Sequence, residues 1–360
     1  MKKVLLFNSE ISTDGISKFL SSIVDNISDD FSVDIMTYII KKDLFFKNSN
    51  VTIHEIGTSK NIIKRIKKKK KKKKKGNYDI VHINGNYWSR VFDCIAAKMC
   101  NVKKIIIHSH NTGTGNNDKI KVFTHKLIKK VFDYVATDYY SCSTEASKWM
   151  FSNRIIKNNE YVIINNGINI DKYKFNLKTR TELRKEYNLQ DKYIIGNIAR
   201  FEYQKNHKYL IEIFKECKKQ NDNAFLLLIG TGSLEAEIKK KVKELGIEKD
   251  ILFLGNKEDA YKYYNIMDSF VLPSIYEGLG IVAIEAQTNG LYCTISSNIT
   301  KEVKISDNIE FLDLSLLPKT WAIEILKNKS KNRKDAYKNT IENNFDIKNV
   351  VLKLEKLYYK

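Results

Sequence analysis

The chain has 360 residues, of which 42% are hydrophobic and 11% aromatic, enough to bury the cores of two domains. This composition excludes a wholly disordered protein, and a content of only 2 prolines excludes collagen-like and proline-rich architectures. No apolar run approaches the ~20 residues that span a bilayer, and the four apolar residues after Lys3 are too few for a signal-peptide core. We therefore expect a cytosolic chain of two domains.

The chain is strongly basic, with 63 Lys and Arg against 42 Asp and Glu and a formal net charge of +21. Eleven of the twelve residues from 64 to 75 are Lys or Arg, and the remainder of the chain is still basic. A basic surface favours anionic partners, such as nucleic acid, acidic lipid headgroups or phosphorylated small molecules. The net charge alone does not select among these three.

The first half of the chain alternates short apolar strands with helices. A strand at residues 3–7 is followed, from Ile16 to Ile27, by apolar residues at the i, i+3, i+4 spacing of an amphipathic helix. The turn signal Asn165-Asn166-Gly167 closes this half. Such alternation implies a parallel sheet that is covered by helices on both faces. The further strands are predicted at residues 32–38, 79–84, 104–108, 139–143 and 161–164.

The second half repeats the same plan. Strands are predicted at residues 193–198, 224–229, 251–254 and 269–272, with helices at 209–219, 234–245 and 260–267. The fold class is therefore α/β, with two Rossmann-like doubly wound domains that face an interdomain cleft. We place the first domain at residues 1–170, a polar connection at 171–192, the second domain at 193–334 and a C-terminal helix at 335–360, with packing against the first domain as one option.

Ligands of such sheets bind at the carboxyl ends of the strands, beside helix N-termini. The most informative segment of this kind is PSIYEGLGIVAIEAQTNG, which begins at Pro273. Its first glycines allow a tight turn, and amide N–H groups at the start of a helix predicted from Leu279 form an anion site suited to a pyrophosphate. Glu285, two helical turns after Glu277, is suited to accept two hydroxyl hydrogen bonds from a ribose or a hexose. A surface loop before a buried helix with a salt-bridged glutamate is the simpler alternative.

Two further loops follow strands in the second half. The segment NIARFEYQKNHK carries Arg200 and Lys205, which would offset the charge of a leaving diphosphate. In a chain with 63 basic residues, an Arg and a Lys five positions apart also arise without any function. The segment LIGTGSL adds a Gly-x-Gly turn between a strand and a helix, at Gly230 and Gly232, which alone is a weak signal.

In their order and spacing, these segments resemble glycosyltransferase family 4, the retaining GT-B enzymes that use nucleotide sugars. The resemblance covers nearly the whole chain and includes the R-x4-K loop, the G-x-G turn, the FLG strand end and the E-x7-E pair. In the first half, DIVHIN, IIIHSHNTG, YYSCSTEASKWMF and VIINNGIN stand where that family places its sheet. The chain is most similar to the capsular and exopolysaccharide branch, which has a similar His-x-His-Asn strand end.

The resemblance implies a role for individual residues. Arg200 and Lys205 would hold the donor diphosphate, and Glu285 would hold the ribose. In such a reaction the leaving phosphate takes the acceptor proton on the same face, and the protein supplies positioning and charge stabilisation. The implied catalytic residues are Glu277, His110, Arg200 and Lys205. The implied donor-binding residues are Arg200, Lys205, Gly230, Gly232, Asn256, Glu277, Gly278, Leu279, Gly280 and Glu285, and the implied acceptor or cleft residues are Gly15, His110 and Asn111.

Two features of the first half of the chain concern its predicted site residues. Family members often have two glycines after the first strand, where this chain has Asp14-Gly15, so the Asp14 side chain would crowd or repel a diphosphate. His108 and His110 share one face of a strand, but no third ligand stands nearby, and the 5 cysteines form no C-x-x-C pair. We therefore expect neither a metal nor another cofactor.

The lysine run at residues 67–75 has two explanations. Nine like charges repel, so the run is either a solvated helix end or an attachment to an anionic membrane, at ~1 kcal/mol per basic residue near the headgroups. The predicted helix at residues 120–135 sets lysines beside apolar residues in a basic amphipathic pattern, which favours the membrane hypothesis. A lipid-linked acceptor would explain why both features lie in the first half.

The sequence thus predicts a retaining hexosyltransferase that is cytoplasmic and peripheral on the inner face of the cell membrane. It would move a hexose or N-acetylhexosamine from a UDP-sugar to a saccharide on a polyprenyl diphosphate carrier, in capsular or exopolysaccharide synthesis. One alternative is a non-catalytic GT-B module that binds a partner transferase or a glycan, although such a module has no need of the diphosphate residues. A second alternative is a basic nucleic-acid-binding protein, although no recognition motif is present and nucleic acid is not an expected partner.

Overall fold

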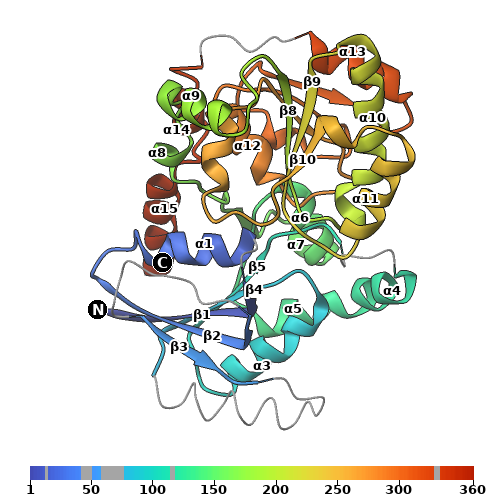
Figure 1. Ribbon diagram of the computed structural model, residues 1–360. Coiled ribbons are helices and arrows are strands. Elements are labelled where there is room, and N and C mark those ends of the chain that lie inside the picture. The colour runs from blue at the N-terminus through green and yellow to red at the C-terminus, as the bar shows by residue number, and fades with distance from the viewer. Residues whose placement is uncertain (13–14, 42–50, 58–76, 114–117, 328–332) are drawn as a thin grey trace. The chain divides into compact units, whose positions relative to one another are not determined.

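The computed structural model describes residues 1–12, 15–41, 51–57, 77–113, 118–327 and 333–360 (Figure 1). The chain divides into two compact units, Met1–Ile168 with Asn344–Lys360, and Asn169–Asn343. The segment expected as a connection, residues 171–192, belongs to the second unit. It contains most of α8 (Ile170–Tyr173) and all of α9 (Leu177–Glu186).

Over its described residues, the first unit is built on a seven-stranded parallel sheet with the order β3-β2-β1-β4-β5-β6-β7. The strands expected from the sequence are all present, and β3 is additional. The order changes direction between β1 and β4, as in a doubly wound sheet. The strands are β1 (Lys2–Ile11), β2 (Phe31–Ile40), β3 (Thr52–Glu55), β4 (Ile80–Asn84), β5 (Lys104–Ser109), β6 (Asp138–Ser141) and β7 (Tyr161–Ile163).

Successive side chains of the central strands point to opposite faces, so this sheet has two cores. Val4 and Leu6 of β1 pack on one face with α1 (Gly15–Val24) and α15 (Ile347–Tyr359). Leu5 and Phe7 pack on the other face with α3 (Val91–Lys98) and α5 (Phe132–Val135). The unit also contains α4 (Lys119–Ile128), α6 (Thr144–Met150) and α7 (Asn153–Lys157).

The C-terminal helix α15 is held on the first sheet by hydrogen bonds as well as by apolar packing. The Tyr358 hydroxyl lies 2.7 Å from Nδ1 of His82 on β4. The ammonium groups of Lys2 and Lys104 donate to the last carbonyls of the helix, at 2.9 Å and 2.6 Å. Cations at this end also interact favourably with the helix dipole.

The second unit has a six-stranded parallel sheet over its described residues, with the order β10-β9-β8-β11-β12-β13. The four expected strands are present, and β12 and β13 extend the sheet. The strands are β8 (Tyr193–Ile198), β9 (Ala224–Ile229), β10 (Ile251–Phe253), β11 (Ser269–Leu272), β12 (Tyr292–Ser296) and β13 (Ile309–Leu312). The helices that follow α8 and α9 are α10 (His207–Gln220), α11 (Glu235–Glu244), α12 (Ile281–Thr288), α13 (Pro318–Leu326) and α14 (Tyr337–Glu342).

Four helices differ from the sequence-based expectation. The single helix expected at residues 120–135 is divided into α4, a 3-10 helix at Lys129–Val131 and α5. The helix expected at residues 260–267 is a 3-10 helix, Ala260–Asn265. The helix expected from Leu279 begins at Ile281, because Gly280 takes a left-handed backbone that cannot belong to an α-helix. The C-terminal helix expected at 335–360 is divided into α14 in the second unit and α15 in the first, with a left-handed residue, Asn344 at φ 59°, between them.

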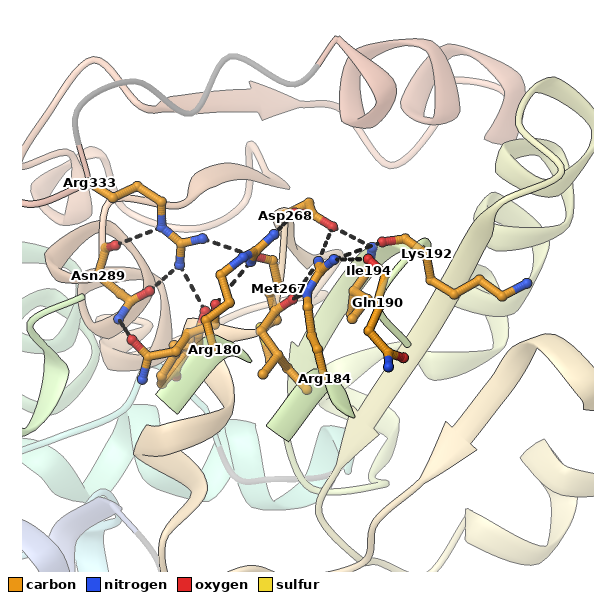
Figure 2. A network of polar contacts seen from close by, with 12 residues as sticks. Arg180, Arg184, Gln190, Lys192, Ile194, Met267, Asp268, Asn289 and Arg333 are labelled. Carbon is orange, nitrogen blue, oxygen red and sulfur yellow. Dashed lines mark hydrogen bonds and ion pairs between the residues drawn. The ribbon is translucent and has the colours of Figure 1, made fainter. Parts of the chain in front are cut away.

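The carboxylate of Asp268, just before β11, joins α9 to the second sheet (Figure 2). Arg180 and Arg184 of α9 each donate to a different oxygen of Asp268 at 2.5 Å. The backbone amide of Ile194 on β8 donates to the same carboxylate at 2.7 Å. Because this partly buried charge has partners on both oxygens, it fixes α9 beside β8 and β11.

The described residues contain neither a disulfide nor a membrane-spanning helix. All five cysteines are free thiols, and four of them are buried. Burial raises the pKa of Cys217 and Cys293 well above the ordinary value, so both remain protonated. Within the described chain, every helix is too short or too polar to cross a bilayer.

Candidate functional site

Three loops meet at the carboxyl edge of the second sheet, after β8, β9 and β10. The Phe201 amide donates to the Thr231 carbonyl at 3.0 Å, so the loop after β8 pairs with the Gly-x-Gly turn after β9. The Gly230 amide donates to the Gly255 carbonyl at 2.8 Å, which joins the same turn to the loop after β10. Three predicted donor-binding segments, which contain Arg200, the two glycines and Asn256, therefore lie on neighbouring loops.

Gly230 and Gly232 are required by the close approach of these loops. A Cβ atom at Gly230 would lie 2.1 Å from the carbonyl oxygen of Ala199, and one at Gly232 would lie 2.4 Å from that of Phe201. Both distances are far below van der Waals contact. A larger residue at either position would push the turn away from the loop that carries Arg200.

The loop after β11 is joined to the segment that contains Lys205. The Ile275 amide donates to the Gln204 carbonyl at 2.8 Å, and Gln204 Nε2 donates to the Tyr276 carbonyl at 2.8 Å and to Glu277 Oε2 at 3.1 Å. Lys205 Nζ lies 2.5 Å from Glu277 Oε1, and these two side chains are only 13% and 7% exposed. The structure thus pairs two predicted catalytic residues and adds Gln204, which carried no signal in the sequence.

The cations at this edge are suited to an anionic ligand. An ammonium group has three N–H donors, so Lys205 can bond Glu277 and still donate to a second acceptor. Arg200 is exposed, and its guanidinium makes no hydrogen bond or ion pair within the described residues. The site therefore combines one anchored cation with one that faces solvent.

The helix after this loop, α12, begins without a capping side chain. Its N-cap is Gly280, with φ 86°, whereas side chains of Asn169 and Asn176 cap α8 and α9. The first amides of α12 are consequently not covered by a cap, and a helix N-terminus carries a positive partial charge. Leu279 is buried, so among the predicted donor-binding residues it can contribute only backbone groups.

Glu285, on α12, has tyrosine partners on both carboxylate oxygens. The Tyr173 hydroxyl donates to Oε1 at 2.8 Å, and the Tyr264 hydroxyl donates to Oε2 at 2.6 Å. Glu285 and Tyr173 are partly exposed, while Tyr264 is fully buried. Neither tyrosine is predictable as a site residue, because nothing in the local sequence relates it to Glu285.

In the first unit, His110 follows β5 and is held by two asparagines. His110 Nε2 lies 2.8 Å from Asn84 Oδ1, and Nδ1 lies 3.1 Å from Asn166 Oδ1. Asn84 Nδ2 donates to the Phe7 carbonyl at 3.2 Å, so its Oδ1 faces His110 as an acceptor. His110 Nε2 therefore carries a proton. The sequence identified Asn166 only as part of a turn.

The remaining predicted residues of the first unit lie in loops. Gly15 opens α1 at an exposed position with no atom within 4 Å of a Cβ placed there, and Asn111 Oδ1 accepts from the Thr112 amide at 2.8 Å. Asp14 and the lysine run at 67–75 lie outside the described residues. No cluster of three or more His, Cys, Asp or Glu that could hold a metal occurs in the part of the chain that is described, and the absence of a metal stays a prediction.

Comparison with known proteins shows which proteins this chain is similar to. Residues 179–308 match the family model described as Glycosyl transferases group 1. The putative glycosyltransferase EpsF of Bacillus subtilis is 31% identical over 233 residues, which cover 63% of this chain and 60% of that relative. CapH, a capsular polysaccharide biosynthesis glycosyltransferase of Staphylococcus aureus, is 26% identical over 326 residues, which cover 87% of this chain and 85% of CapH.

A third relative is named for its donor and acceptor, and a solved structure shares the fold. The UDP-Gal:alpha-D-GlcNAc-diphosphoundecaprenol alpha-1,3-galactosyltransferase of Escherichia coli is 25% identical over 305 residues, which cover 79% of this chain and 76% of that enzyme. The crystal structure of Anabaena Alr3699/HepE in complex with UDP-glucose has a TM-score of 0.82 at 15% identity, over 100% of both chains. The predicted α/β fold of GT-B type, with two Rossmann-like units, is confirmed.

Proposed function

We propose that this chain, whose residues 179–308 match the group 1 glycosyltransferase family model, moves a hexose or N-acetylhexosamine from a UDP-sugar to a lipid-linked saccharide in capsular or exopolysaccharide synthesis. The printed names of three similar proteins support this proposal. CapH is named for capsular polysaccharide biosynthesis, the Escherichia coli relative for transfer to a sugar on diphosphoundecaprenol, and HepE was crystallised with UDP-glucose. The acceptor we propose is accordingly a saccharide on a polyprenyl diphosphate.

The observation that carries the proposal is the joining of loops at the carboxyl edge of the second sheet. Backbone hydrogen bonds connect the loops after β8, β9 and β10, and the Lys205–Glu277 pair connects them to the loop before α12. One edge thus presents an exposed guanidinium at Arg200, a buried ammonium and an uncapped helix start. These groups are suited to a diphosphate.

In the proposed reaction, the chain positions the substrates and stabilises the charge of the leaving group. Arg200, Lys205 and the first amides of α12 would stabilise the negative charge that develops on the leaving diphosphate. Glu277, held by Lys205 and Gln204, would bind the donor sugar, and Glu285 would bind the ribose. His110, Gly15 and Asn111 are proposed for the acceptor side. No metal is included, since two cations and the helix amides already supply positive charge.

A thermal-shift screen tests donor binding. Wild type should be stabilised by one class among UDP-, GDP-, TDP- and ADP-sugars, and Arg200→Ala and Glu285→Ala should each reduce that shift. Lys240→Ala, an exposed lysine on α11 whose nearest carboxylate is 3.8 Å away, is the control for loss of a surface charge. Equal shifts in wild type, Arg200→Ala and Glu285→Ala would show that these residues do not form the donor site.

Release of the nucleoside diphosphate separates an enzyme from a binding module. The proposed enzyme releases UDP when both a UDP-sugar and a lipid-linked saccharide are present, and addition of EDTA leaves the rate unchanged. Binding of the UDP-sugar without any release or hydrolysis, across a panel of acceptors, would favour a non-catalytic module.

We further propose that the first unit contacts an anionic membrane from the cytoplasmic side, where a lipid-linked acceptor is presented. One face of α4 supports this proposal, because Ile120, Phe123 and Leu127 are 76%, 63% and 60% exposed. These apolar side chains lie on a helix flanked by lysines, a pattern typical of helices that bind the membrane interface. The lysines in and next to α4 are Lys119, Lys121, Lys126, Lys129 and Lys130.

A further inference from the structure

The loop that carries Arg200 and Lys205 has a carboxylate between these two cations, at Glu202. The Glu202 amide donates to the Arg200 carbonyl at 2.8 Å, and the Lys205 amide donates to the Glu202 carbonyl at 2.9 Å. Glu202 is also the N-cap of the 3-10 helix Tyr203–Lys205. The backbone of Glu202 is therefore bonded to both of the cationic residues that we propose for the diphosphate.

The side chain of Glu202 reaches the neighbouring loop, after β9. Its Oε1 accepts from the Ser233 amide at 3.1 Å, and its Oε2 accepts from the Ser233 hydroxyl at 2.8 Å. Ser233 comes directly after the Gly-x-Gly turn and two residues before α11 begins. One carboxylate thus joins the cationic loop to this turn through both of its oxygens, and we call this the Glu202–Ser233 contact.

The start of α11 accounts for the place of this carboxylate. A helix N-terminus has unsatisfied amides and a positive partial charge, so a negative side chain is stabilised beside it. The N-cap of α11, Leu234, offers no capping side chain. Within the described residues, Glu202 makes no ion pair, and neither does Arg200. The charge of Glu202 therefore lies against α11 and leaves the Arg200 guanidinium unpaired.

The two ends of the cationic loop are held by other contacts. At the first end, the Phe201 carbonyl accepts from the Leu234 amide at 2.9 Å. At the other end, Lys205 bonds Glu277 in the loop before α12. Between these ends, the Tyr203 side chain is 51% exposed. The Glu202–Ser233 contact thus holds the middle of the loop beside the Gly-x-Gly turn.

We infer that Glu202 is a positioning residue for the donor diphosphate, because through Ser233 it holds Arg200 and Lys205 in place beside the Gly-x-Gly turn. The inference rests on the proposed function, since it takes a nucleoside diphosphate as the ligand. Glu202 is itself an anion, so its charge repels a diphosphate. The effect of Glu202 through position and its effect through charge therefore have opposite signs, and one substitution separates them.

Calorimetric titration of the full chain with UDP and with UMP measures the sign. UMP lacks the β-phosphate, so the ratio of the two affinities reports the contacts of the diphosphate. We expect wild type to bind UDP about tenfold more tightly than UMP or better, as one hydrogen bond to a charged group predicts. In Glu202→Ala this ratio should fall below about threefold. If Glu202 acted by charge alone, the same variant would raise the ratio above the wild-type value.

A double-mutant cycle tests whether Glu202 acts through Ser233. Ser233→Ala removes the hydroxyl but keeps the amide, so its ratio should lie between those of wild type and Glu202→Ala. Glu202→Ala/Ser233→Ala should have the same ratio as Glu202→Ala, since the contact is already lost. The control is Glu244→Ala, which removes an exposed carboxylate of α11 whose ion pair with Lys240 is 3.8 Å long. This control should keep the wild-type ratio.

A weakened fold lowers both affinities together, so their ratio separates positioning from general damage. Glu202→Ala with the wild-type ratio or a higher one would overturn the inference. A further fall of the ratio in the double variant, or an equal fall in Glu244→Ala, would also overturn it. A wild type that binds UDP no more tightly than UMP, or that binds neither, would overturn the proposed diphosphate site, and the inference with it.

Discussion

Replacement of Lys205 by methionine should destabilise the second unit, because it removes the partner of a buried carboxylate. The ammonium lies 2.5 Å from Glu277 Oε1, and the two side chains are 13% and 7% exposed. Breaking such a pair on one side costs ~3–5 kcal/mol. Gln204 still donates to the other oxygen of Glu277, so we expect the lower end, about 3 kcal/mol. For a unit of this size, that corresponds to a decrease of roughly 6–12 °C in Tm.

A double variant separates stability from activity. In Lys205→Met/Glu277→Gln the unpaired charge is gone, so about 2 kcal/mol of the loss should return. Transfer of sugar should nevertheless be absent from both variants, since each lacks a proposed diphosphate contact. Thermal unfolding followed by calorimetry, with the transfer assay on the same samples, measures both quantities.

The control is an ion pair of the same length on the surface of the same unit. Lys208 Nζ lies 2.5 Å from Glu237, but these side chains are 53% and 50% exposed. Lys208→Met should therefore change stability by less than about 1 kcal/mol. If Lys205→Met costs no more than Lys208→Met, the Lys205–Glu277 pair is not a buried pair in solution, and our account of the edge is wrong.

Three other predictions concern separate parts of the chain. Gly232→Ala should abolish nucleotide binding in calorimetry, because its Cβ would meet the Phe201 carbonyl at 2.4 Å; unchanged binding would contradict the role of the turn. Burial lowers the pKa of His207 to about 3 in the folded chain. Between pH 6.5 and pH 3 this histidine is therefore protonated in the unfolded chain but not in the folded chain, so the free energy of unfolding should decrease as the pH falls through this range. His207→Phe should make that fall less steep by about 1.4 kcal/mol per pH unit in urea titrations, and an unchanged slope would refute it. Phe123→Glu with Leu127→Glu should reduce sedimentation with acidic liposomes at low salt, while equal sedimentation would exclude α4 as the contact.

Much of the fold is predictable because its central strands are short, apolar and separated by turns. Strands such as β4 and β9 are buried along their whole length, which is what a continuous apolar segment indicates. The strand β3 is absent from the prediction because it is a four-residue edge strand, TIHE, with both ends exposed. The strand β12, YCTIS, is fully buried, but its Thr and Ser weaken the apolar pattern.

The candidate site also has a part that is predictable from the sequence and a part that is not. Its loops are predictable because glycines and charged residues follow strands directly, as at Gly230 and Arg200. The side chains that contact Glu277 and Glu285 are not predictable, because tertiary packing sets these contacts. Tyr173 is 112 residues from Glu285, and Gln204 is 73 residues from Glu277. No local pattern relates positions so far apart, and a tyrosine or glutamine occurs in many roles.

A crystal structure of the full chain with UDP would show whether the second unit holds the donor nucleotide. We expect the diphosphate within hydrogen-bond distance of Arg200, Lys205 and the first amides of α12, with the ribose hydroxyls at Glu285. Electron density for UDP elsewhere on the chain, or none at a saturating concentration, would contradict it.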